Sequence, residues 1–283
     1  QYIYNQNGCY DSITDYLHVY PKPLSDFNLN IESGCEELNI NFLDKDPISI
    51  PHRFNKKEDI EISGFLVATI SWGNRISILN SGHRMMQLMG NDPYNFIISH
   101  SNKDLEQLSS FVHRTFKGSD FIYFVRALKH LYLNHGGLEF TFSQKLDLER
   151  MDKNINNFKK LFFELPHEKR IEKHVSDPLK GSAAKRLNMY LRWMVRPAKN
   201  KVDFGIWNRI KPSQLSCPLD IHSGNAARSL GLIKRKQNDQ KALVELDERL
   251  REFDPNDPVK YDFALFGLGV NEKFNNNDLN KIV

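Results

Sequence analysis

The sequence predicts a mostly helical, all-α protein. Apolar residues recur at helical spacing in several runs, and glycine or proline residues end most of these runs. Only two short stretches, 140–142 and 201–204, have the composition of strands. At 283 residues the chain is long enough to bury one large core or two lobes.

The first expected helix begins after Asn55. Asn55 is placed to act as its N-cap, with Glu58 reaching back to complete a capping box. The residues that follow are apolar on most sides of a helix, so we expect this helix to be buried. A second helix is expected over 75–89, where Gly90 stops it.

The other expected helices are each opened by a polar cap or ended by glycine or proline. They cover 120–135, 154–163 and 189–195, then run from Asn238 or Asp239 to Phe253, and from Asp257 to Gly267 or Gly269. The connections between them are short. We therefore divide the chain into an unassigned N-terminal extension (1–41), a helical domain (42–270) and a C-terminal tail (271–283).

Composition excludes several classes of protein. Hydrophobic residues make up 40% and charged residues 26%, which is typical of a soluble globular chain. The sequence has no apolar run of the ~18 residues that a membrane helix needs, so we expect no membrane association. Cys9, Cys35 and Cys217 are widely separated, as suits a reducing cytoplasm, where we expect the protein to be located. They cannot form a four-cysteine iron–sulfur cluster.

No cofactor or metal is expected from the motifs. The 10 histidines form neither a His-x-x-x-His pair nor a His-Glu-x-x-His run. His130 and His135 lie five positions apart, and surface or capping roles are the simplest interpretation for them. Phosphate-binding and nucleotide-binding glycine motifs are also missing from the sequence.

Lys185 and Asp220 form the most informative pair of residues. A short turn, 181–184, begins with a glycine and is followed directly by Lys185 and a helical run. Asp220 precedes a second helical run. A lysine held at a helix N-terminus is a better nucleophile than one in water. A nearby carboxylate can stabilise a cation that forms during a reaction. The alternative is a solvated lysine at a helix start and an aspartate that acts only as an N-cap.

The positive charge of the chain is small but unevenly distributed. The formal net charge is +4. Basic residues cluster around the turn and again after the second helical run: Lys180, Lys185, Arg186, Arg192, Arg196, Lys199, Lys201 and 234–236. This pattern fits a nucleic-acid-binding face, and it equally fits a solvated basic surface.

The segment Gly181-Ser182-Ala183-Ala184-Lys185, followed by a helix, resembles the helix-hairpin-helix turn of the base-excision DNA glycosylases. The segments 219–222, 228–232 and 62–75 resemble three further motifs of that superfamily. The spacing of Lys185 and Asp220 is closest to that of the archaeal 8-oxoguanine DNA glycosylase branch. As a whole, residues 42–270 look like an uncharacterised bacterial family placed near this superfamily. Two positions depart from the pattern: Ala183 replaces the second glycine of the turn, and 71–73 has no glutamine.

The resemblance implies a two-lobed, helix-hairpin-helix DNA-glycosylase-like fold with a cleft between the lobes. In that fold the early chain and the last helix share one lobe, and the middle helices form the other. The partner would be damaged duplex DNA, bound by a monomer without a cofactor. The function would be base-excision repair by a glycosylase with AP-lyase chemistry, on 8-oxoguanine-type oxidised purines.

The resemblance also implies roles for individual residues. Lys185 would attack C1′ of the sugar and form a Schiff base, and Asp220 would stabilise the sugar cation. The DNA backbone would be held by the hairpin residues Gly181, Ser182, Ala183 and Arg186. The pocket for the flipped base would be lined by Trp72, Met189, Asp262 and Phe266, although core packing explains Met189 and Phe266 equally well. The alternative function is a catalytically inactive helix-hairpin-helix nucleic-acid-binding protein.

Overall fold

A computed structural model describes residues 3–4, 10–11, 45–144, 149–197 and 202–270 of the chain. The protein is mostly helical, as expected. Most of the N-terminal extension, the C-terminal tail, Lys199 and Lys201 lie outside the described residues. Two short hairpins contain the strands described: β1 (Ile3–Tyr4) pairs with β2 (Tyr10–Asp11), and β3 (Val112–His113) with β4 (Phe116–Lys117).

The α-helices follow one another along the chain with short 3-10 turns between them. They are α2 (Lys57–Ile70), α3 (Arg75–Leu88), α4 (Pro93–Ser99), α5 (Asn102–Gln107), α6 (Gly118–Asn134), α7 (Gly137–Phe142), α8 (Asp152–Phe162), α9 (Lys185–Val195), α10 (Ile221–Ser229), α11 (Gln240–Phe253) and α12 (Asp262–Val270). The 3-10 turns are η2 (Pro47–Ser49), η3 (Pro51–Arg53), η4 (Leu108–Ser110), η5 (Lys169–His174), η6 (Pro178–Lys180), η8 (Pro212–Gln214) and η9 (Pro258–Tyr261).

The expected helices are confirmed, but some of their details are wrong. The helix α2 is buried, as its composition indicated, but its N-cap is Lys56 and not Asn55. The expected cap of Asp239 on α11 is confirmed, because its carboxylate accepts hydrogen bonds from two N–H groups of the first turn. The last helix begins with the 3-10 turn η9 and continues past both glycines to Val270.

The two stretches expected to be extended are not strands. Residues 140–142 belong to α7, where Leu138, Thr141 and Phe142 are buried at the three- and four-residue spacing of a helix. The ring of Phe142 stacks on that of Phe158 in α8 with 4.0 Å between centroids, so tertiary packing overrides local composition here. Residues 202–204 carry no strand pairing.

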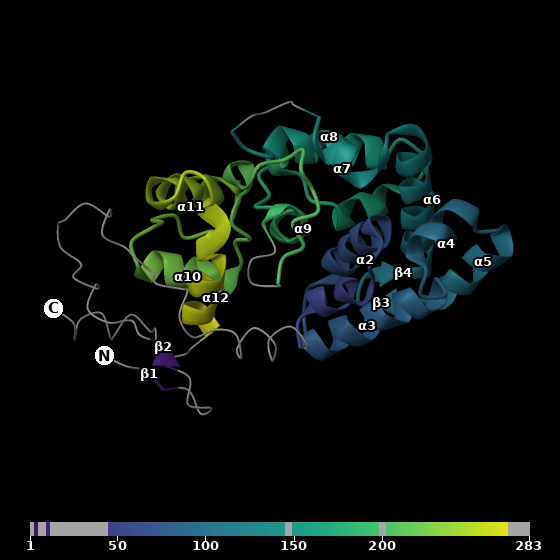
Figure 1. The fold of residues 1–283 in the computed structure, drawn as a ribbon, viewed down its shortest axis with the longest axis horizontal. Coiled ribbons are helices and arrows are strands. Elements are labelled where there is room, and N and C mark those ends of the chain that lie inside the picture. The colour runs from purple at the N-terminus through teal and green to yellow at the C-terminus, as the bar shows by residue number, and fades with distance from the viewer. Residues whose placement is uncertain (1–2, 5–9, 12–44, 145–148, 198–201, 271–283) are drawn as a thin grey trace.

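The helices pack around two hydrophobic cores. The main core joins α2, α3, α6, α8 and α9, and it includes the buried Trp193 and Trp207. The small core joins α10, α11, η9 and α12, and its members are Ala183, Cys217, Leu219, Ala226, Ala227, Leu232, Ile233, Ala242, Leu243, Leu246, Leu250, Tyr261 and Leu265. Figure 1 shows α10, α11 and α12 gathered at one end of the described structure, with α9 between them and the remaining helices.

The two cores do not by themselves reproduce the division into lobes that the resemblance implies. The described early chain, represented by α2 and α3, shares the main core with the middle helices. The last helix, α12, packs on α10 and contributes Leu265 to the small core, and its Phe263 packs against the main core. Within the described part of the chain, each helix is too short or too polar to cross a lipid bilayer.

A buried carboxylate fixes α2 inside the main core. Glu61 accepts a hydrogen bond of 2.6 Å from the indole N–H of Trp207 and another of 2.6 Å from the hydroxyl of Tyr132. Burial raises the pKa of Glu61, and the two donors partly oppose this effect by stabilising the carboxylate. Since Tyr132 lies in α6 and Trp207 lies after α9, these bonds connect α2 with α6 and with the segment that follows α9.

Candidate active site around Lys185 and Asp220

Lys185 and Asp220 lie at the beginnings of two different helices, and their side chains meet. Lys185 is the first residue of α9, and Asp220 is the N-cap of α10. The Nζ atom of Lys185 lies 3.9 Å from Oδ2 of Asp220. Both side chains are partly accessible to solvent, with 32% and 22% of their surface exposed. The pair expected from the sequence is therefore assembled and reachable from outside.

Asp220 is held firmly by the start of its own helix. Its Oδ1 atom accepts hydrogen bonds from the backbone N–H groups of His222 (2.8 Å) and Ser223 (3.0 Å). The hydroxyl of Ser223 accepts the N–H of Asp220 in return, at 2.9 Å, which completes a capping box. The side-chain amide of Asn238 donates to the carbonyl of Asp220 at 2.7 Å. The other carboxylate oxygen of Asp220, Oδ2, faces Lys185.

The turn before Lys185 contains two residues in the left-handed backbone region. Gly181 has φ +88°, and Ala184 has φ +44° and ψ +37°. For alanine this conformation costs roughly 1–2 kcal/mol, so the surrounding structure has to hold it. Ser182 contributes, because its hydroxyl accepts the N–H of Ala184 at 3.1 Å.

Ala183, which replaces the second glycine of the expected turn, is not among the left-handed residues. Its side chain lies in the small core, whereas that of Ala184 lies in the main core. The left-handed alanine of the turn is therefore Ala184, one residue after the replaced glycine.

The first turn of α9 is not capped by a side chain in the described structure. An uncapped helix N-terminus presents N–H groups and a partial positive charge, which together favour an anion. The expected contacts of Gly181 and Ser182 with a DNA backbone are compatible with this position. At Gly181 the surface is open, since a β-carbon there would meet no atom within 4 Å.

Arg186 points into the protein, contrary to its expected contact with DNA. Its guanidinium donates to the carbonyl of Thr69 at the end of α2 and lies 4.8 Å from the ring centroid of Trp72. Burial lowers the pKa of Arg186 to about 10. This side chain fastens α9 to α2.

Trp72, expected as a wall of the base pocket, is covered by protein groups. The guanidinium of Arg186 lies over its ring. The ring of His113 packs edge-on at 5.2 Å, and that of His174 lies 6.1 Å away. These contacts favour a packing role for Trp72.

Asp262 is close to the pair but is not free to read a base edge. It is 6% exposed, and its carboxylate forms an ion pair with Arg192 of α9. The thiol of Cys217 donates to its other oxygen at 3.6 Å. Burial raises the pKa of Asp262, and the positive charges of Arg192 and Lys185 oppose this rise. The expected edge contact is therefore replaced by a structural contact between α9 and α12.

Two arginines of the basic cluster expected around the turn are paired with carboxylates. Arg192 also contacts Asp203 at 3.3 Å, and Arg196 contacts Asp203 and Asp257 at 3.2 and 2.9 Å. These partly or fully buried pairs fasten the end of α9 to η9 and α12. Lys180, by contrast, is exposed beside the turn.

Of the expected pocket residues, Met189 contacts the pair, and Phe266 contacts the helix that Asp220 caps. The sulfur of Met189, one helical turn after Lys185, is 3.7 Å from the lysine Nζ. Phe266 in α12 packs edge-on against the ring of His222, with 5.9 Å between centroids. The guanidinium of Arg75, at the start of α3, lies 5.9 Å from the Phe266 ring. Met189 and Phe266 are both only partly buried.

Asp46 is an acidic residue near the site that the sequence did not reveal. Its Oδ2 lies 3.9 Å from Arg75, and its Oδ1 caps the turn η2 by accepting the N–H of Ile48. Burial raises the pKa of Asp46, and this rise is opposed by the Ile48 hydrogen bond and then by the charges of Arg75, Arg192 and Lys185. Lys185 is thus within electrostatic reach of three aspartates. The only signal in the sequence is the Asp-Pro pair that opens η2.

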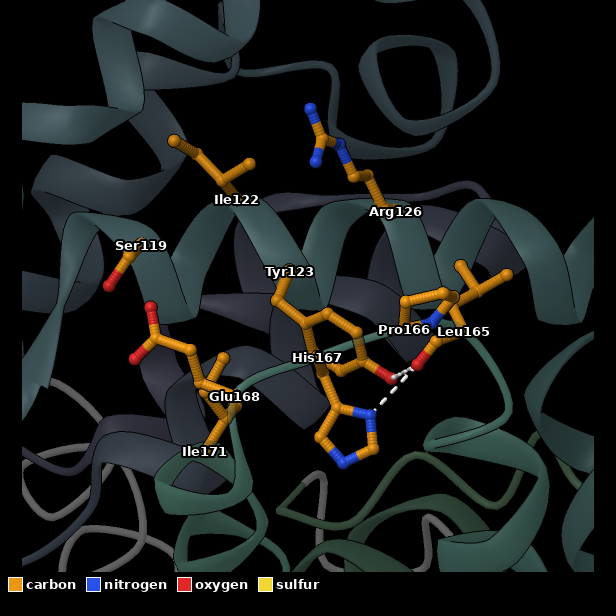
Figure 2. A pocket seen from close by; sticks show the side chains of 9 residues that line it. All are labelled: Ser119, Ile122, Tyr123, Arg126, Leu165, Pro166, His167, Glu168 and Ile171. Carbon is orange, nitrogen blue, oxygen red and sulfur yellow. Dashed lines mark hydrogen bonds between the residues drawn. The ribbon is translucent and has the colours of Figure 1, made fainter.

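Two hollows in the described surface lie away from this pair. One is formed by residues of α6 and of the segment 165–171, including Tyr123, Arg126 and His167 (Figure 2). The other lies between α3 and the segment 110–112. Neither contains Lys185 or Asp220, so the expected cleft between the lobes remains an expectation.

Comparisons with known proteins give one match. Residues 46–271 match the family model described as "Protein of unknown function (DUF2400)". Searches of curated proteins and of solved structures return no match. The matched region covers the main core, the small core and both residues of the pair. Because it spans most of the chain, this protein belongs to the DUF2400 family.

Proposed function

We propose that this protein is a DNA glycosylase with AP-lyase activity, in which Lys185 is the nucleophile. The observation that carries the proposal is the 3.9 Å contact between the amine of Lys185 and Oδ2 of Asp220, at two solvent-accessible helix starts. An amine beside a carboxylate is the arrangement that covalent catalysis at a sugar carbon requires.

The proposed reaction starts from an unprotonated Lys185 amine. Its Nζ bonds to C1′ of the sugar while the bond from C1′ to the base breaks, and the base leaves with that electron pair. The amine then gives up a proton, which the carboxylate oxygen Oδ2 of Asp220, 3.9 Å away, can accept. The nitrogen lone pair then forms a C1′=N double bond while the C1′–O4′ bond breaks, and O4′ takes up the proton that Asp220 had accepted. The sugar ring is thereby opened and a Schiff base remains. The negative charge of Asp220 also stabilises the cationic sugar in the transition state.

The two carboxylate oxygens of Asp220 have different contacts, and this difference supports the proposed role. Two backbone N–H groups hold Oδ1, which fixes the orientation of the carboxylate, and Oδ2 remains directed at the amine. A preorganised carboxylate of this kind avoids reorganisation during the reaction. The uncapped N-terminus of α9 supplies N–H groups for a phosphate next to the reacting sugar.

Damaged duplex DNA with an oxidised purine of the 8-oxoguanine type is the substrate that we propose. Met189 and Phe266 are the residues that we assign to a flipped base, because both are partly buried, Met189 in contact with Lys185 and Phe266 in contact with His222 of α10. A thioether and an aromatic ring provide apolar contact surface for a purine.

Borohydride trapping tests the proposal directly. The full chain is incubated with duplexes that contain 8-oxoguanine, guanine or an abasic site, and borohydride reduces any Schiff base to a stable adduct. We expect an adduct with the damaged duplexes and none with Lys185→Gln. Lys180→Gln is the matched control, since it removes an exposed lysine of the same turn and should still form the adduct. Equal trapping by Lys185→Gln would exclude a covalent role.

The alternative is a catalytically inactive nucleic-acid-binding protein. The left-handed Gly181 and the uncapped start of α9 favour it, because both serve phosphate binding without any chemistry. In that case no duplex would give an adduct, while binding would weaken steeply with increasing salt.

A further inference from the structure

His130, His135 and Glu164 form a cluster on the side of α6. His130 lies in the last turn of α6, His135 is the residue that ends this helix, and Glu164 follows the end of α8. The Nε2 atoms of His130 and His135 lie 2.8 and 3.1 Å from Oε2 of Glu164. The two Nε2 atoms are 3.2 Å apart. Three side chains thus direct one potential ligand atom each to a common point.

These distances match the donor set of a zinc ion. Zinc is bound by histidine nitrogen and carboxylate oxygen at about 2.0–2.2 Å, so neighbouring donors around a tetrahedral ion are about 3.3 Å apart. The three distances in the cluster are 2.8, 3.1 and 3.2 Å. Only a small outward movement of side chains that are 23%, 24% and 41% exposed is needed to admit the ion.

A neighbouring amide can support metal binding by His130. The side chain of Asn134 lies 2.9 Å from Nδ1 of His130. When Nε2 binds a metal, Nδ1 carries the proton and needs an acceptor. The oxygen of the Asn134 amide becomes that acceptor after a rotation that exchanges its nitrogen and oxygen.

We propose that His130, His135 and Glu164 bind a zinc ion through Nε2, Nε2 and Oε2. Two histidines and one glutamate leave at least one coordination position for water. The ion would join the end of α6 to the chain that follows α8. It would lie next to the hollow of Figure 2, because Arg126 is one turn before His130 on α6 and Leu165 directly follows Glu164.

Calorimetric titration with zinc chloride of the full chain, stripped with a chelator, tests the site. Because thiolates also bind zinc, the titration uses a Cys9→Ser, Cys35→Ser background. We expect one equivalent to bind and to raise the Tm, since a ligand of the folded state stabilises it. His135→Ala and Glu164→Gln should each weaken binding by more than about tenfold, and Asn134→Ala by about tenfold.

His100→Gln is the matched control, because His100 is a partly buried histidine at the end of α4 with no ligand partner in this cluster. It should bind zinc as the parent does. Cobalt gives a second measurement: its visible absorption bands should form with the parent and be lost in His135→Ala. The proposal would be overturned if the parent did not bind zinc, or if the variants His135→Ala and Glu164→Gln bound zinc as tightly as the parent.

Discussion

Gly269 of α12 lies directly against the carbonyl of His222 in α10, so close that a β-carbon on Gly269 would sit 2.1 Å from that oxygen. This contact sets the distance between α12 and the start of α10, where Asp220 is the cap. The ring of His222 also lies 3.3 Å from the carbonyl of Gly269. The position of Asp220 therefore depends on a glycine that is distant from it in the sequence.

Gly269→Ala should lower the free energy of unfolding by about 1–3 kcal/mol, because the added methyl group forces the two helices apart. Gly267→Ala in the same helix is the matched control, since a β-carbon there meets no atom within 4 Å. That change should be neutral or stabilise the protein by up to about 1 kcal/mol, through helix propensity alone. Urea unfolding of the two variants measures the difference. Equal effects would mean that the close contact with His222 is not a constraint.

Asp220→Asn should separate the structural role of Asp220 from its proposed chemical role. Asparagine caps helices about as well as aspartate, so the stability should change little, whereas Asp220→Ala should cost about 1 kcal/mol. Both variants remove the charge beside Lys185. Single-turnover base excision should therefore fall by about 100-fold or more in both. Retention of full activity in Asp220→Asn would argue against a role for the carboxylate charge.

Asp262→Ala should mainly destabilise the protein. It removes one of the two aspartates that form ion pairs with the buried guanidinium of Arg192 in the described structure, and breaking a buried ion pair costs about 3–5 kcal/mol. Met189→Leu conserves volume and should cost less than about 1.5 kcal/mol. Thermal unfolding of the two variants compares these costs. If Asp262→Ala were as stable as the parent but selected its substrate poorly, the base-edge role would be restored.

The stability of the protein should fall as the pH drops from about 6.5 towards 4. Burial lowers the pKa of His174 to about 4, and the nearby Asp120 only partly opposes this effect. Asp120 lies 3.2 Å from Nε2 of His174 and is also paired with Arg170 at 2.8 Å, and its charge raises the pKa of His174 by less than burial lowers it. The unfolded chain therefore binds a proton in this range that the folded protein does not.

The expected loss is about 2–3 kcal/mol, from the size of the pKa difference. Urea unfolding at several pH values measures it, with His174→Gln as the comparison. The variant should lose less stability than the parent over the same range. Identical pH profiles would show that His174 titrates normally.

Much of the helical architecture was predictable because it depends on local patterns. The helices α3, α6 and α11 have regular apolar spacing and clear end signals, such as Asp239. The stretch 140–142 was not predictable locally, because its helical state depends on the stacking of Phe142 against Phe158. The partition of the lobes also depends on distant contacts.

The same distinction applies to the sites. Lys185 and Asp220 could be paired because each stands in a local motif at a helix start. The inward turn of Arg186 depends on Thr69 and Trp72, which are remote in sequence. Only the tertiary fold brings Asp46 near Lys185, and only the tertiary fold brings Glu164 to His130 and His135. Spacing along the chain contains no signal for either.

The chain passes from the small core to the main core across one peptide bond, the bond between Ala183 and Ala184. Lys185 thus begins a helix that packs mainly in the main core, and Asp220 caps a helix that packs in the small core. Smaller units generally open at lower free energy than the whole protein. Subglobal opening of the small core would separate the pair while α2 and α6 stay folded. Amide hydrogens of α10 and α11 should accordingly exchange faster than those of α2 and α6, and adduct formation should vanish at a lower urea concentration than the bulk of the helical circular dichroism signal.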